Sequence, residues 1–211
     1  MKHLSTVEMI GAVACMTEII ITNEIPFCEL DSAAGDGDFG MSLAKGFKEI
    51  KSQWESMLSD DFETFLRNCS LVITEYCGGA SGPIWGSGFR GAARAAKGIS
   101  SFGVMEIASI LDSAAASIMK TGGAQLGDKT LLDALIPAAE SLKESAAMGI
   151  GLKSALEASA MQAVRGAEST KNIIATKGRA SYLGERSLQF PDAGATAIGI
   201  IFTHVVEHLF Q

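Results

Sequence analysis

Residues 62–73 read FETFLRNCSLVI, and their apolar side chains recur every three or four positions. That spacing places them on one face of a helix, with polar side chains on the opposite face. The apolar face comprises Phe62, Phe65, Leu66, Cys69 and Ile73. The same spacing recurs in residues 107–118 and 195–209, and no strand-like alternation of useful length competes with it. The sequence therefore predicts an all-α protein.

Glycine, proline and polar turn residues divide this pattern into separate helices. We expect eight of them, at residues 4–23, 38–58, 60–77, 82–97, 104–121, 129–148, 152–174 and 193–210. Most connections are short, which favours antiparallel neighbours and predicts an eight-helix antiparallel up-and-down barrel or bundle. Because no linker, change in composition or internal repeat interrupts the chain, residues 1–211 are predicted to form a single domain.

The longer connections between helices indicate where a site lies. They are residues 24–37, 77–83, 121–129 and 175–192, and they follow the first, third, fifth and seventh expected helices. When helices alternate in direction, every second connection lies at the same end of the bundle. All four are therefore expected at one end, which is the candidate site.

The composition and charge of the chain exclude several classes of partner. Apolar residues make up 47% of the 211 residues and charged residues 19%, as in globular proteins. The formal net charge of −7 argues against nucleic acid, although it permits an anionic small ligand that a metal ion holds. The sequence shows no signal peptide, no membrane-spanning apolar run and no CxxC spacing among its four cysteines. We therefore expect a soluble cytoplasmic protein with free thiols and no membrane partner.

The stretch richest in chemistry is LDSAAGDGDFG, residues 30–40. Asp and Gly favour turns, so this stretch is expected to fold tightly and to bring Asp31, Asp36 and Asp38 together. Three close carboxylates repel one another unless a cation lies among them, and Mg²⁺ or Ca²⁺ prefers such all-oxygen sites. A solvated turn is the plainer interpretation, and Asp38 alternatively caps the helix that follows. The second glycine-rich turn, at residues 78–83, favours the metal site.

Residues 78–83, GGASGP, follow one helix and open the next. Glycines let a ligand approach the backbone, and Pro83 suits the first turn of a helix. Backbone N–H groups and the Ser81 hydroxyl favour an anion site here, although a plain connection between helices explains the turn equally well. The sequence contains neither a P-loop nor the GxGxxG motif of a dinucleotide-binding fold. Any nucleotide phosphate is therefore expected to be held by metal and backbone amides.

The third and fourth loops add polar residues and glycine to the same end. Gly122 permits the close approach of a flat base. Asp128 is expected to cap the following helix, whereas Lys129 either neutralises phosphate or faces solvent. Arg179 has the planar fork that grips phosphate oxygens, and Asp192 is placed to cap the last helix.

Five motifs follow one another along the chain: DxxxxDGDxG from Asp31, then GGASGP, GDKT, KGRASYLGER and DxGAT. In this order they resemble the L subunit of dihydroxyacetone kinases (DhaL), and the resemblance runs from Asp31 to the last helix. That family is an eight-helix barrel that holds ADP or ATP at one end through two Mg²⁺ ions. The resemblance thus implies a nucleotide site at the end that the order of the loops selects.

The resemblance also implies a role for each matching residue. Asp31, Asp36 and Asp38 are implied as the Mg²⁺ ligands. The residues implied around the nucleotide are Phe39, Gly40, Met41 and Ser42 beside it, Ala80 and Ser81 at the phosphates, Gly122 and Leu131 at the adenine, and Arg179, Asp192, Ala193 and Gly194 completing the pocket. Two positions depart from the family. Phe39 stands where many members have His, so a hydrogen bond to the nucleotide is lost or replaced by packing, and DAG replaces DPG at residues 192–194.

In members that depend on the phosphotransferase system, the resemblance implies a phosphoryl shuttle. A phosphohistidine of the M subunit donates to ADP on the L subunit, and the phosphoryl group then passes to dihydroxyacetone on the K subunit. Such transfer requires mainly positioning and charge neutralisation. No residue of the chain is typical of a base for a sugar hydroxyl, so we assign no catalytic residue beyond the metal and nucleotide ligands.

The expected partners are therefore the K and M subunits, and a homodimer is left open. Two alternatives to the shuttle stay open as well. One is the nucleotide subunit of a kinase that uses free ATP on a short ketose. The other is a nucleotide-sensing partner of a transcription regulator, which the intact aspartates disfavour as a sole role.

Overall fold

The computed structural model describes residues 3–211, and within them the prediction of an all-α protein is confirmed. Eight helices of 14 to 19 residues dominate this described part: α1 (Thr6–Thr22), α3 (Phe39–Ser52), α5 (Phe62–Tyr76), α6 (Ser81–Ala96), α7 (Val104–Gly122), α8 (Leu132–Ala147), α9 (Leu152–Ser169) and α10 (Ala193–Leu209). The shorter elements are α2 (Glu24–Ser32), α4 (Trp54–Met57), the 3₁₀ helices η1 (Thr170–Asn172) and η2 (Arg179–Ser187), and the antiparallel pair β1 (Leu4–Ser5) and β2 (Ser101–Phe102).

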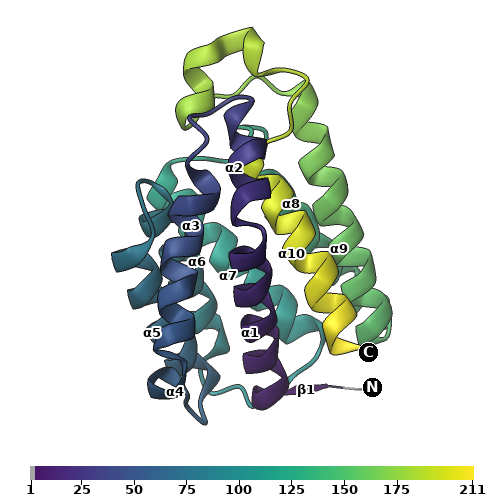
Figure 1. Cartoon of the computed structure of the whole chain (residues 1–211). Coiled ribbons are helices and arrows are strands. Elements are labelled where there is room, and N and C mark those ends of the chain that lie inside the picture. The colour runs from purple at the N-terminus through teal and green to yellow at the C-terminus, as the bar shows by residue number, and fades with distance from the viewer. Residues whose placement is uncertain (1–2) are drawn as a thin grey trace.

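The long helices run side by side along the length of the molecule (Figure 1), and their contacts close into a ring. Each packs against the next along the chain, from α1 through α3 and α5 to α10, and α10 packs against α1 again. The apolar faces that the periodicity indicated point into this ring. They enclose a cavity of about 220 Å³ lined almost entirely by apolar side chains. The expected eight-helix barrel is thus confirmed, and the four cysteines are free as expected.

The prediction that residues 24–37 form a loop is wrong, because α2 occupies the first nine of them. Pro26 is compatible with this helix because it lies in the first turn of α2, where a backbone N–H has no partner within the helix in any case. The helix α2 packs against α3. Their approach is so close that a Cβ on Gly40 would lie 2.0 Å from the Glu24 carbonyl oxygen.

Three other predicted boundaries also differ. The helix expected at residues 38–58 breaks at Gln53 into α3 and α4, which lets Trp54 pack edge-on against Phe65 at 5.3 Å between ring centroids. The helix expected at 129–148 begins only at Leu132. The loop expected at 175–192 contains η2, with a kink at Gly184. Hydrophobic spacing alone did not indicate these three helix ends, which depend on tertiary contacts or on local backbone conformation.

The segment between α9 and α10 arches over the end of α2 at the top of the barrel, while β1 and the C-terminus lie at the opposite end (Figure 1). Within the described residues no single helix combines the length and hydrophobicity that a membrane span requires; α1 and α2 meet these criteria only as a pair, and they join at a bend of 61°.

Candidate functional site

A pocket of about 250 Å³ opens at the end of the barrel where the four longer loops meet. Each loop contributes to its wall, the first through Asp36, the second through Gly79, the third through Lys129 and the fourth through Arg179. The prediction that the four loops lie at one end of the barrel is therefore confirmed. The pocket is the point at which separate parts of the sequence can act on one ligand.

Three carboxylates lie on one wall of this pocket. Asp31 belongs to the last turn of α2, and Asp36 and Asp38 belong to the turn that leads into α3. One oxygen of each carboxylate lies within 4.8 Å of the others, and in the part of the chain that the structure describes no other group of acidic, His or Cys side chains has metal-binding spacing. Asp38 holds the N-cap position of α3 but makes no capping hydrogen bond with its side chain. Its carboxylate thus remains available to a ligand.

The turn that holds these carboxylates depends on glycine. A Cβ at position 35 would lie 2.1 Å from Oδ1 of Asp31, so only Gly35 lets the backbone wrap around that carboxylate. The N–H of Gly37 donates to Oδ2 of Asp31 at 2.9 Å. Burial raises the pKa of Asp31, and the like charges of Asp36 and Asp38 raise it further. This donor set fits a hard divalent cation, which would offset the repulsion.

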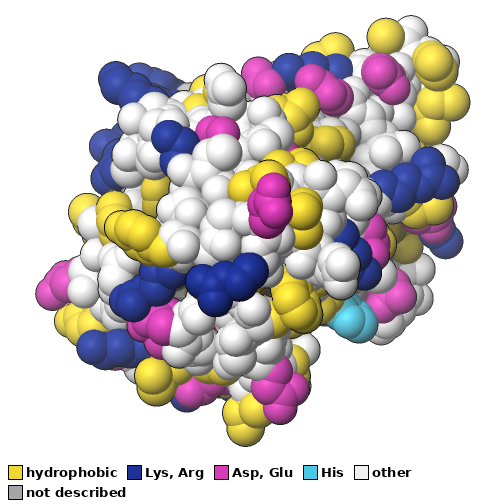
Figure 2. Space-filling model, turned by 90° about the horizontal axis from the view of Figure 1, so that it is seen from above, with side chains coloured by type: hydrophobic (Ala, Val, Ile, Leu, Met, Phe, Trp, Pro, Cys, Tyr) yellow, Lys and Arg dark blue, Asp and Glu magenta, His cyan; other side chains and the backbone are white. Residues whose placement is uncertain are grey.

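One positive group already contacts the carboxylate cluster. Nη1 of Arg179 lies 2.7 Å from Oδ2 of Asp36, across the mouth of the pocket. The Arg179 side chain is 67% exposed, so the pair adds little to stability, and the guanidinium can exchange Asp36 for another anion. Figure 2 views the protein from this end and shows Lys and Arg side chains among the Asp and Glu side chains of the face, despite the net charge of −7.

The second loop places a helix N-terminus in the pocket. Gly79 and Ala80 lie in the turn before α6, and Ser81 begins that helix. No side chain caps this end of α6. The N–H of Ser81 donates to the carbonyl of Gly78 at 3.1 Å and Pro83 has no N–H, so among the first three residues the N–H of Gly82 is the one left without a partner. The turn is fixed to α3 by a hydrogen bond from the N–H of Gly78 to the carbonyl of Ser42, at 3.0 Å. The arrangement is typical of an anion site.

The structure corrects the predictions for the third loop. Asp128 does not cap α8; its carboxylate accepts from the Thr176 hydroxyl at 2.6 Å and from the N–H of Gln125 at 2.8 Å, which joins two loops. Lys129 matches neither alternative, because it is only 2% exposed and its ammonium donates to backbone carbonyls. The Thr176 partner of Asp128 and the carbonyl partners of Lys129 lie more than 40 residues away in sequence. No local pattern could have identified them.

The prediction that Asp192 caps the last helix is confirmed. Its carboxylate accepts from the N–H of Ala195 at 2.7 Å and caps α10. Burial raises the pKa of this carboxyl to about 7, although the hydrogen bond from Ala195 and the charge of Lys129 both act to lower it. A cap at the base of the fourth loop thus fixes the turn of residues 192–194 beside the pocket.

Most residues implied around a nucleotide lie on the pocket wall. They are Phe39, Ser42, Ala80, Ser81, Leu131, Arg179, Asp192, Ala193 and Gly194. Three do not line it: Gly40 faces α2, Met41 is largely exposed, and Gly122 ends α7 beside Ile84. The wall also includes Thr130 and Lys177, which belong to the GDKT and KGRASYLGER motifs but had no role assigned, and Ile84, which directly follows GGASGP.

Known proteins resemble this chain along nearly all of its length. A family model described as the DAK2 domain matches residues 33–207. The chain belongs to the DAK2-domain family. Within that family, the ADP-binding subunit DhaL of the PEP-dependent dihydroxyacetone kinase of Escherichia coli (strain K12) is 33% identical over 195 residues, which are 92% of this chain and 93% of the relative. The DhaL subunit of kinase 2 from Listeria innocua is 37% identical over 184 residues, 85% and 84% of the two chains.

A solved dihydroxyacetone kinase contains the same fold. The dihydroxyacetone kinase of C. freundii, in complex with AMP-PNP and Mg²⁺, superposes with a TM-score of 0.75 at 26% identity. The match covers 99% of this chain and 35% of that kinase. The predicted resemblance to a kinase L subunit is therefore confirmed, and so is the prediction of membership in a family of phosphotransferases.

Proposed function

We propose that this chain is the nucleotide-binding subunit of a dihydroxyacetone kinase and carries ADP or ATP with Mg²⁺ in the pocket between the four loops. One observation carries the proposal: three clustered carboxylates and an uncapped helix N-terminus face the same pocket. Carboxylates suit a divalent cation, and the helix N-terminus suits a phosphate that the cation accompanies. The DAK2-domain relatives named as ADP-binding subunits support this interpretation.

The residues of the pocket divide into two groups. Asp31, Asp36 and Asp38 would hold the metal, as two ions by analogy with the L subunits. When bound, Mg²⁺ supplies charge neutralisation and orientation to the phosphates. Arg179 and the N-terminus of α6 would bind phosphate oxygens. Phe39 and Leu131 offer apolar surface to the rest of the nucleotide.

The chain itself then acts as a carrier of a phosphoryl group. It receives that group from a phosphohistidine of the M subunit and delivers it to dihydroxyacetone, or a related short ketose, on the K subunit. The pocket holds no His side chain, so a substrate-activating base would belong to another subunit. The PEP dependence in the names of the two full-length relatives supports a donor other than free ATP.

A turnover assay tests the donor. The purified chain is mixed with the K subunit and dihydroxyacetone, and either phosphorylated M subunit or free ATP is added. Turnover with phosphorylated M subunit alone is the expected result. Repeated turnover on free ATP would instead favour an ATP-dependent short-ketose kinase, and no turnover with either donor would leave the sensing role as the better account.

A further inference from the structure

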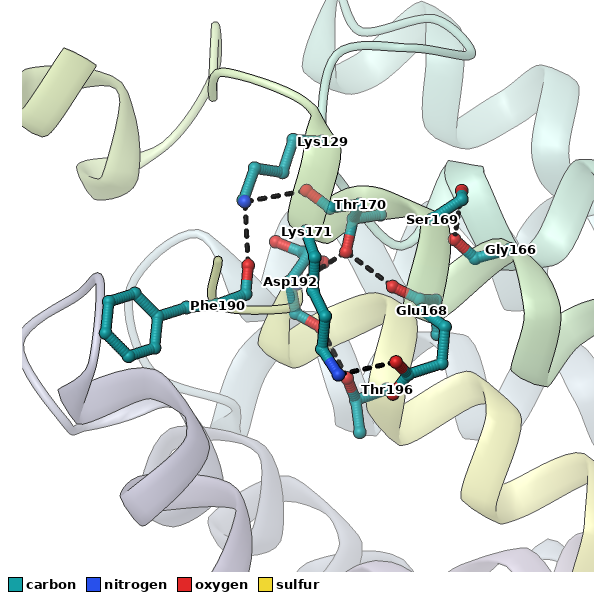
Figure 3. A network of polar contacts seen from close by, with 10 residues as sticks. Lys129, Gly166, Glu168, Ser169, Thr170, Lys171, Phe190, Asp192 and Thr196 are labelled. Atoms are coloured by element: carbon teal, nitrogen blue, oxygen red, sulfur yellow. Dashed lines mark hydrogen bonds and ion pairs between the residues drawn. The ribbon is translucent and has the colours of Figure 1, made fainter. Parts of the chain in front are cut away.

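Lys129 is a charged side chain in the protein interior, with 2% of its surface exposed. Its ammonium nitrogen Nζ donates to four backbone carbonyls, those of Thr170 at 2.7 Å, Ile173 at 3.2 Å, Ser187 at 2.7 Å and Phe190 at 2.8 Å. Figure 3 shows the ammonium pointing at two of these groups, in Thr170 and Phe190. With three N–H donors shared among four acceptors, Nζ has no capacity left for a ligand.

All four carbonyls belong to one segment, residues 170–190, which connects α9 to α10. This segment carries Arg179, which lines the pocket, and it leads directly into the turn of residues 192–194, which also lines it. The four acceptors come from both ends of the segment, so a single cation draws its two ends together. Lys129 itself lies on the third loop, two residues before Leu131 of the pocket wall.

Besides Lys129, polar contacts of Thr176 with Asp128 and small buried residues such as Ser187 anchor the segment, but large apolar side chains contribute little. None of its large apolar side chains is fully buried: Tyr182 is 87% exposed, and Ile174 and Phe190 are each 43% exposed. Apolar burial therefore fixes it weakly. The carbonyls around Nζ would lose their partner without the lysine, and buried polar groups that lose a partner disfavour the folded arrangement.

A second contact joins the same cluster to the pocket. The N–H of Asp192 donates to the Thr170 hydroxyl at 2.8 Å, and the carbonyl of Thr170 is one of the acceptors of Lys129. The positive charge of Lys129 also lowers the pKa of the buried Asp192 carboxyl, so the two charges favour each other. The ammonium, Thr170 and Asp192 thus form a continuous connection from the third loop to the cap of α10 (Figure 3).

We propose that Lys129 is a positioning residue of the nucleotide site: its ammonium fixes residues 170–190, and through them it sets Arg179 and the turn at 192–194 against the ligand. This inference rests on the proposed nucleotide binding. It assigns to the lysine of the GDKT motif a role at a distance from the phosphates rather than a contact with them.

Calorimetric titration of ADP with Mg²⁺ tests this role, using wild type, Lys129→Met and two controls. Lys171→Met removes a lysine of the same segment whose ammonium faces Glu168 on the surface. Ser159→Ala removes a buried hydrogen bond to Ala138 in the barrel wall. We expect Lys129→Met to raise Kd about tenfold or more, because binding must then order the segment, and both controls to leave Kd unchanged. Hydrogen exchange of the free Lys129→Met variant is expected to accelerate in residues 173–190 and not in α5 or α6.

Two results would overturn the inference. One is a Lys129→Met variant that unfolds at lower temperature but binds with the wild-type Kd, as Ser159→Ala is expected to do; the lysine would then be structural only. The other is unchanged hydrogen exchange in residues 173–190. If Lys129→Met does not fold, Lys129→Gln replaces it, and an unchanged Kd has the same meaning. A wild type that fails to bind ADP with Mg²⁺ would refute the proposed function, and this inference with it.

Discussion

Arg179 and Asp36 form an ion pair of 2.7 Å across the mouth of the pocket, between the fourth loop and the first. The guanidinium contacts one of three carboxylates that would otherwise face one another without a neighbouring cation. A metal ion and Arg179 therefore compete for Asp36. A bound phosphate would offer Arg179 a second anion. Whether Arg179 pairs with Asp36 therefore depends on whether a ligand is bound.

Substitution of Arg179 should separate metal binding from nucleotide binding. Arg179→Met is expected to tighten binding of Mn²⁺ alone by about two- to fivefold, the scale of an exposed ion pair, because the competing cation is gone. The same variant should bind ADP with Mg²⁺ more weakly, because a phosphate contact is lost. Calorimetric titration measures both affinities. Arg186→Met, in the same loop but outside the pocket wall, is the matched control; equal effects in the two variants would contradict the assignment.

The contact between α2 and α3 should be sensitive to a single methyl group. Gly40→Ala places a Cβ 2.0 Å from the Glu24 carbonyl oxygen, so the helices must separate, and we expect a loss of about 1–3 kcal/mol in the free energy of unfolding. Gly11→Ala, inside α1 with no atom within 4 Å of the added Cβ, should stabilise the protein by up to about 1 kcal/mol. Urea unfolding measures both. If Gly40→Ala and Gly11→Ala changed the free energy of unfolding equally, the close approach of α2 and α3 would not be what requires glycine at position 40.

The buried carboxyl of Asp192 should make stability depend on pH. Its pKa is raised from 3.8 to about 7, so the folded state holds a proton that the unfolded state releases between these values. The free energy of unfolding should therefore fall as pH rises from about 4 to about 7 and level off above that. Urea unfolding of wild type and Asp192→Asn across this range isolates the contribution. If the free energy of unfolding changed with pH in the same way in wild type and in Asp192→Asn, Asp192 would not be the source of the pH dependence.

The sequence was sufficient to predict the barrel and the gathering of its four longer loops at one end. Regular spacing, as in Phe62, Phe65 and Ile73, marks a helix face without knowledge of its partners. The alternation of helix direction then assigned the four long loops to one end. The helix α2 was missed because residues 24–37 were interpreted as one connection, although the proline among them, Pro26, lies in a first turn and is compatible with a helix.

Within the site, local motifs predicted local contacts and missed distant ones. The cap formed by Asp192 involves a residue three positions away, and the prediction was correct. The contacts of Asp128 with Thr176, and of Lys129 with Phe190, cross 48 and 61 positions of sequence. Such contacts depend on how the third and fourth loops meet in the folded barrel. They are therefore not encoded in the spacing of neighbouring residues.

The assignment of Asp31, Asp36 and Asp38 as metal ligands is the central claim, and the Mg²⁺ dependence of ADP binding tests it most directly. ADP is titrated into the protein once with Mg²⁺ present and once with EDTA present. Wild type should bind ADP tightly with Mg²⁺ and only weakly with EDTA. Asp36→Asn keeps the shape of the side chain but not its charge, and it should bind ADP equally weakly with Mg²⁺ and with EDTA. Asp60→Asn, on the exposed loop before α5, should bind ADP as tightly as wild type when Mg²⁺ is present. Mg²⁺-dependent binding that survives unchanged in Asp36→Asn would contradict the account.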